Sequence, residues 1–110
     1  KSQLRVLSFK EMKDGWDHPS DPAPSHAVID KVIEVLGKIT VELPCTFPSF
    51  QGGVRFEWDT PGGAIEVDFF NDKLVYLTAI NMEVDDELEV HLDNPKLHTI
   101  IDEFYAEHTK

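Results

Sequence analysis

The sequence predicts an α+β domain with two N-terminal helices, a four-stranded antiparallel meander and a C-terminal helix, the helices packing on one face of the sheet. Apolar residues recur at helical spacing from Ser25 to Ile39 and from Leu97 to Tyr105. Apolar and polar residues alternate on both sides of a Pro-Gly-Gly turn, and two further strand-like runs follow before residue 93. A chain of 110 residues suffices for one core, so we expect residues 1–110 to form a single domain.

The clearest element is a β-hairpin over residues 52–70, with its turn at residues 59–63. Strand alternation places on one face Val54, Phe56, Trp58, Ile65 and Val67. It places on the other face Arg55, Glu57, Asp59, Glu66 and Asp68. Pro61 fixes its φ angle, and we expect Gly62 and Gly63 to supply the positive φ angles of a tight reversal.

The N-terminal region predicts two helices with a loop between them. Leu4–Lys13 fits a short amphipathic helix that Gly15 would end. The proline-rich residues 16–25 form a loop, which Trp16 is expected to hold against the core. Ser25 is the expected N-cap of the second helix. Its apolar stripe comprises Val28, Ile29, Val32, Ile33, Val35, Leu36 and Ile39, and Glu34 and Lys38 have the spacing of an ion pair.

The remaining elements follow in order along the chain. Leu43–Gln51 contains two prolines and predicts an extended connector, with three residues buried as anchors: Cys45, Phe47 and Phe50. Lys73–Ile80 predicts a central strand, and Glu87–Leu92 a half-buried strand after a turn near residues 85–86. Asn94 is the expected N-cap of the last helix, with Pro95 at its first position.

Composition narrows the class of partner. Ten Lys and Arg against 21 Asp and Glu give a formal net charge of −11, which argues against direct binding to nucleic acid or to an anionic membrane. A basic protein surface or a cation would be attracted instead. No apolar stretch reaches the roughly 20 residues of a membrane span, and residues 1–9 lack the apolar run of a signal peptide. We therefore expect a cytoplasmic protein.

Motifs that carry chemistry are not evident. The five histidines include no HExxH pair, and no linear EF-hand loop is present. Asp17 and His18 could form an acid/base pair, but loop residues of this kind more often bond the local backbone. Gly52-Gly53 lacks the lysine of a phosphate-binding loop and is interpreted as turn chemistry. Cys45 is the sole cysteine and is expected to be a packed thiol. No catalytic residue, metal ligand or cofactor is predicted.

The outward side of the predicted sheet is the candidate site. If all strands share one inward face, six carboxylates project outward together: Glu57, Asp59, Glu66, Asp68, Glu87 and Glu89. Only Arg55, Lys73 and His91 offset their charge. Such a face either keeps the protein soluble and blunts edge pairing, or docks a basic partner, or holds a metal ion.

The stretch Asp14-Gly15-Trp16-Asp17, the proline-rich loop, the amphipathic helix and residues 48–58 (PSFQGGVRFEW) together resemble a group of small bacterial proteins. These share a GWD…PSxxGGVxxEW pattern and have no assigned activity. The resemblance covers the first two-thirds of the chain and leaves out residues 82–110. It implies the order of elements and a bacterial cytoplasmic setting, and it implies no catalytic residues.

These observations favour a non-enzymatic binding module, an inhibitor such as an immunity protein, antitoxin or anti-defence factor. Its acidic surface would dock on a basic toxin or nucleic-acid-processing enzyme. One alternative is a small metal-assisted enzyme that uses sheet carboxylates and a histidine such as His91. Another is a structural or assembly protein that forms a homodimer.

Overall fold

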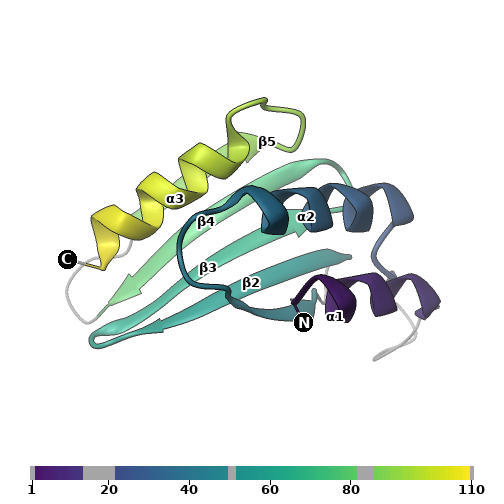
Figure 1. Cartoon of the computed structure of the whole chain (residues 1–110), viewed down its shortest axis with the longest axis horizontal. Helices are drawn as coiled ribbons and strands as arrows, with labels where there is room; N and C mark the ends of the chain where they lie inside the picture. The colour runs from purple at the N-terminus through teal and green to yellow at the C-terminus, as the bar shows by residue number, and fades with distance from the viewer. Residues whose placement is uncertain (1, 14–21, 50–51, 82–85, 110) are drawn as a thin grey trace.

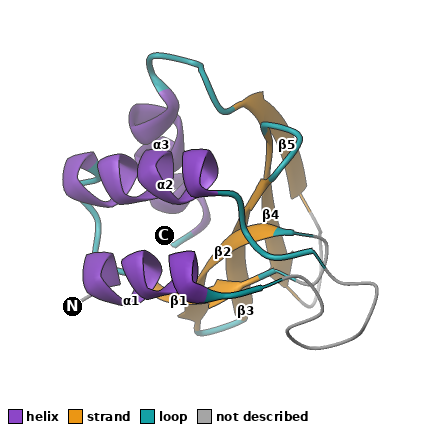
Figure 2. Ribbon diagram, turned by 90° about the vertical axis from the view of Figure 1, so that its right-hand side faces the viewer, coloured by secondary structure: helices purple, strands orange, loops and turns teal. Residues whose placement is uncertain are grey.

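The protein consists of a layer of helices packed on one face of an antiparallel sheet (Figures 1 and 2). The computed structural model describes residues 2–13, 22–49, 52–81 and 86–109. Its helices are α1 (Ser2–Ser8), the 3-10 turn η1 (Phe9–Glu11), α2 (His26–Lys38) and α3 (Leu97–His108). Its strands are β1 (Cys45–Pro48), β2 (Gly53–Thr60), β3 (Gly63–Phe70), β4 (Leu74–Asn81) and β5 (Asp86–His91). None of the described helices has the length and apolar character needed to cross a membrane.

The sheet is a meander in the order β1-β2-β3-β4-β5, with every neighbouring pair antiparallel. The predicted α+β class, antiparallel sheet and central hairpin are confirmed, and Phe56 and Val67, which lie opposite each other, share the predicted apolar face. The predicted count of four strands is wrong, because the segment expected to be a connector contains β1. Prolines at residues 44 and 48 hide this strand in the sequence, yet an edge strand tolerates proline since half of its N–H groups need no ladder partner.

The expected buried anchors of this segment are also corrected. Cys45 is exposed and Phe47 is 38% exposed, because both side chains lie on the sheet face turned away from the helices. Phe50 lies outside the described residues. The buried residue of β1 is instead Thr46, which faces the helices and has a hydroxyl oxygen without a hydrogen-bond partner in the described structure.

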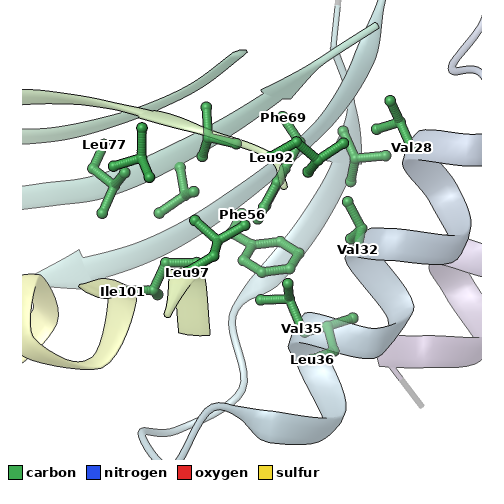
Figure 3. Packing of buried hydrophobic residues seen from close by; sticks show 14 of the residues in the cluster. Val28, Val32, Val35, Leu36, Phe56, Phe69, Leu77, Leu92, Leu97 and Ile101 are labelled. Atoms are coloured by element: carbon green, nitrogen blue, oxygen red, sulfur yellow. The ribbon is translucent and has the colours of Figure 1, made fainter. Parts of the chain in front are cut away.

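The core fills the space between the helices and the inner face of the sheet, meaning the face that the helices cover. The sheet contributes Val54, Phe56, Trp58, Ile65, Val67, Phe69, Val75, Leu77 and Ala79, all buried. Figure 3 shows Val32 and Val35 of α2 and Leu97 of α3 gathered around Phe56. The Phe56 ring also meets the rings of Phe69 and Trp58 edge to face, at centroid distances of 4.8 and 6.0 Å. Burial on this scale is the main favourable term for folding.

Helix α2 forms as predicted. The Ser25 hydroxyl accepts a hydrogen bond from the Val28 N–H at 3.2 Å, and Lys38 pairs with Glu34 at 2.9 Å. The entry to the helix is further held by Asn71 in the β3–β4 turn. Its side-chain oxygen accepts the Ser25 N–H at 2.8 Å, and its nitrogen donates to the Ala23 carbonyl at 2.9 Å. A turn of the sheet therefore positions the start of a helix 46 residues earlier in the chain.

The first helix is shorter than predicted. It spans Ser2–Ser8, continues as η1 and ends at Met12, which is extended at ψ 149°. Its stripe is also narrower, since Val6 and Phe9 are buried whereas Leu4 and Leu7 are 70% and 45% exposed. The expected roles of Gly15 and Trp16 lie outside the described residues.

The last helix begins later than predicted. Asn94 does not cap it: its side-chain oxygen accepts the Lys96 N–H at 2.9 Å, and its carbonyl accepts the Leu97 N–H at 3.1 Å. These bonds form a separate turn that ends where α3 starts. The strand predicted after residue 86 begins at Asp86 itself. It is more exposed than expected, because Leu88 on its inner face is 42% exposed.

Candidate functional site

The outer face of the sheet, meaning the face turned away from the helices, is the candidate site (Figure 2). The strand register places all six predicted carboxylates on it. Two rows of residues on this face cross all five strands. One row is Phe47, Arg55, Asp68, Tyr76 and Glu89. The next is Cys45, Glu57, Glu66, Thr78 and Glu87. Asp59 lies beyond the second row, opposite Ala64.

Two of the six carboxylates, those of Asp68 and Glu66, form ion pairs with Arg55, whose single positive charge offsets one of their two negative charges. The Arg55 Nε donates to Asp68 Oδ1 at 2.7 Å and its terminal nitrogen to Asp68 Oδ2 at 3.3 Å, a two-pronged pair. The other terminal nitrogen lies 3.3 Å from Glu66 Oε2. Hydrogen bonding to Asp68 raises the pKa of Arg55 above its usual value, against a smaller opposing effect of burial. Asp68 is only 7% exposed, so its carboxylate is not available to a partner.

The other four carboxylates belong to Glu57, Asp59, Glu87 and Glu89. Within the described residues, none of them takes part in an ion pair. Glu57 faces Glu66 directly across the strands, an arrangement of like charges that costs stability. The available negative charge therefore lies on β2 and on the edge strand β5.

Apolar and aromatic side chains share the outer face with these charges. Phe47, Tyr76 and Ile80 are 38%, 36% and 41% exposed. The Tyr76 ring meets Phe70 edge to face at 5.4 Å, and a hydrogen bond between its hydroxyl and Glu89 raises the pKa of Tyr76. Sequence reasoning missed Tyr76 and Ile80 because the run Leu74–Leu77 suggested a strand buried on both faces. The alternation of Tyr76 with Val75 and Leu77 was the available signal. It missed Phe47 because that residue was expected to be a buried anchor of a connector.

Several residues singled out in the sequence have structural roles. Gly52 and Gly53 have φ angles of 81° and 112°, and a Cβ on Gly53 would lie 1.8 Å from the Phe69 carbonyl oxygen. Gly52 and Gly53 thus allow the chain to turn before β2, as predicted. Trp58 donates its indole N–H to the Glu42 carbonyl at 2.8 Å. Asp17 and His18 lie outside the described residues.

The described residues do not form a cluster of side chains that would support the alternative of a metal-binding site. Among residues 2–13, 22–49, 52–81 and 86–109, no three His, Cys, Asp or Glu side chains come together in a way that could hold a metal ion. His91, the histidine considered for metal-assisted chemistry, lies 3.7 Å from Asp93 and is exposed.

The chain matches no protein-family model, no curated protein and no solved structure. Its resemblance to the GWD…PSxxGGVxxEW group remains an expectation. What the protein does must be inferred from the geometry of the outer face.

Proposed function

We propose that this protein is a non-enzymatic binding module that docks the outer face of its sheet on a basic partner protein. The observation that carries the proposal is that no described element covers this face, which combines exposed aromatic and aliphatic side chains with four carboxylates that have no ion-pair partner among the described residues. In the bacterial cytoplasm, such a module would act as an inhibitor: an immunity protein, an antitoxin or an anti-defence factor. Its target would be a toxin or a nucleic-acid-processing enzyme.

Charge supports a basic partner. The net charge of −11 attracts cationic surfaces over long distances, and the enzymes that process nucleic acid carry basic clefts. Glu57, Glu87 and Glu89 would steer such a cleft toward the sheet. Electrostatic steering of this kind acts mainly on the association rate and weakens with added salt.

The apolar residues of the face support direct docking beyond long-range attraction. Tyrosine is enriched among residues that dominate binding energy, and Tyr76 lies on an interior strand with Phe70 beside it. The Arg55–Asp68 pair next to it satisfies its own charges within the protein. We expect Tyr76 to supply affinity and the surrounding carboxylates to supply orientation and rate.

A matched pair of triple variants tests the proposal. The face variant replaces Glu57, Glu87 and Glu89 with Gln, and the control variant replaces Glu11, Glu103 and Glu107, which lie on η1 and α3. Both lose three negative charges by the same substitution. Each protein is used to capture partners from a bacterial lysate, and a captured protein is identified, purified and titrated at low and high salt.

The proposal expects a basic captured protein whose association rate falls about tenfold or more with the face variant and little with the control. It also expects that added salt reduces the wild-type rate toward that of the face variant. Equal loss in both variants, or an acidic captured protein, would contradict the proposal. Tyr76→Ala should lower affinity mainly by faster dissociation.

A further inference from the structure

The two edges of the sheet differ in whether their backbone groups are blocked. In an antiparallel ladder, alternate residues of an edge strand turn their N–H and C=O groups away from the sheet. On β1 the Ser49 N–H bonds Gly53, which by alternation places Thr46 and Pro48 in the outward-turned positions. Arg5 of α1 donates its Nε–H to the Thr46 carbonyl at 2.7 Å, and Pro48 has no N–H. Helix α1 lies along this strand (Figure 2), so α1 and Pro48 obstruct the addition of another strand at the β1 edge.

Among the described residues, nothing blocks the β5 edge. The Leu92 N–H bonds the Lys73 carbonyl at 2.8 Å, so residues 92, 90, 88 and 86 turn their backbone groups toward β4. Glu87, Glu89 and His91 therefore turn theirs outward. The His91 carbonyl accepts the Asn94 N–H at 3.0 Å, but within the described chain the N–H and C=O groups of Glu87 and Glu89 have no partner. Four backbone groups at the edge are thus available to an added strand.

The side chains of β5 specify what such a strand must contain. Glu87 and Glu89 lie on the outer face, whereas Leu88, 42% exposed, lies on the inner face. In a strand added beside β5, side chains would alternate between the outer face, next to Glu87 and Glu89, and the inner face, next to Leu88. Basic residues would match the glutamates and apolar residues would cover Leu88.

A second copy of this chain fits poorly. Antiparallel pairing of two β5 strands centred on Leu88 would place Glu87 of one copy opposite Glu89 of the other, and like charges in direct register are unfavourable.

We infer that the β5 edge binds an extended segment of the basic partner by strand addition, the segment alternating basic and apolar residues. This inference rests on the proposed function and gives its mode of engagement: the added strand extends the outer face by one strand. Main-chain hydrogen bonds to Glu87 and Glu89 hold the segment, and their carboxylates select its basic side chains.

The test uses an eight-residue peptide of alternating lysine and valine, blocked at both ends, and measures its affinity for the full chain by titration. Two N-methylated forms of this peptide carry identical charge. One is methylated on the lysine amides and the other on the valine amides. Only one of these sets can face β5, so strand addition expects one form to lose at least tenfold in affinity and the other to keep it. Hydrogen exchange should show the Glu87 and Glu89 amides protected when the parent peptide binds.

A pair of protein variants supplies independent evidence. Glu89→Gln removes only the charge, whereas Glu89→Pro also removes the outward N–H and leaves the ladder bonds to β4 in place. Glu89→Pro should bind the peptide at least tenfold more weakly than Glu89→Gln, with thermal melting used to establish that both fold.

Equal affinity of the two N-methylated peptides, or no binding of the parent peptide, would overturn strand addition. If the parent binds with salt dependence but the methylated forms do not differ, the acidic face still docks basic segments and only the mode is wrong. The proposed function itself fails on its own test, in which the face and control triple variants behave alike. A dimer in light scattering that disappears with Glu89→Pro would assign the edge to a second copy and overturn the inference.

Discussion

The inner and outer faces of the sheet carry side chains from the same strands in strict alternation, yet they meet different requirements. On the inner face, Phe56 touches residues from two helices and two neighbouring rings, and its exposure is zero. On the outer face, Tyr76 contacts Phe70 and Glu89 and stays 36% exposed. Burial of the apolar side chains on the inner face provides the main favourable free energy of folding. The outer face retains rings that stay partly exposed and four carboxylates that have no ion-pair partner among the described residues.

Truncating one aromatic residue on each face should give the largest contrast. Phe56→Ala leaves a cavity that helices on one side and a sheet on the other cannot fill, and should cost about 3–5 kcal/mol in the free energy of unfolding. Tyr76→Ala removes one cross-strand ring contact and should cost about 1 kcal/mol or less. Urea unfolding measures both. Similar losses of unfolding free energy in the two variants would mean that the outer face contributes as much to stability as the inner face.

The two glycine-containing turns next to β2 should respond in opposite directions. Gly53→Ala places a Cβ 1.8 Å from the Phe69 carbonyl oxygen at a φ of 112° and should cost about 2 kcal/mol or more. Gly62 has no atom within 4 Å of an added Cβ, and neither Gly62 nor Gly63 adopts the positive φ that the sequence suggested. Gly62→Ala should therefore stabilise by about 0.4–1 kcal/mol. Chemical denaturation of the two variants distinguishes them, and loss of stability in both would contradict this assignment.

Carboxylates on the outer face should divide into structural and free groups. Asp68→Asn leaves the Arg55 guanidinium facing an amide nitrogen in a site that is 7% exposed, and should cost about 1–3 kcal/mol. Glu57→Gln removes a carboxylate opposite Glu66 and should change stability by about 0.5 kcal/mol or less. If both variants unfold at the same urea concentration as wild type, the Arg55–Asp68 pair contributes nothing to the fold.

The smallest effect concerns pH and the contact between α3 and β5. His108 Nδ1 lies 2.8 Å from the Phe104 carbonyl oxygen and Nε2 2.8 Å from Asp86 Oδ2, so both ring nitrogens face acceptors. The hydrogen bond to Asp86 raises the pKa of His108, opposed by burial. A raised folded-state pKa gives stability that is fully present below the unfolded value of about 6.5 and disappears as pH rises through the folded value.

Urea unfolding from about pH 5.5 to about pH 9 tests this contact. The difference in stability between wild type and His108→Gln should be greatest at the acidic end and shrink as the pH rises. Asp86→Asn should remove most of the same dependence. A difference that grows with pH would show that His108 is not stabilised as the imidazolium.

Residue alternation predicted which side chains share each face, because a strand in a sheet buried on one side admits only one register. For the same reason, alternation groups the six carboxylates on one face. Alternation could not show that Arg55 pairs with Asp68, since the register between strands brings their side chains together. It also could not show that Tyr76 stays exposed on a strand so rich in apolar residues.

The sequence by itself determined the α+β class, the central hairpin, the Ser25 cap and the composition of the two faces, because period, turn residues and caps are local properties. Only the tertiary structure decided that residues 45–48 form an additional strand, β1. An edge strand that contains proline depends on its neighbouring strand for its hydrogen bonds. The tertiary structure also decided which edge is obstructed, through a hydrogen bond from Arg5 to a residue 41 positions away. Contacts between distant segments set which charges and backbone groups remain free, and those free groups are the basis for the proposed function.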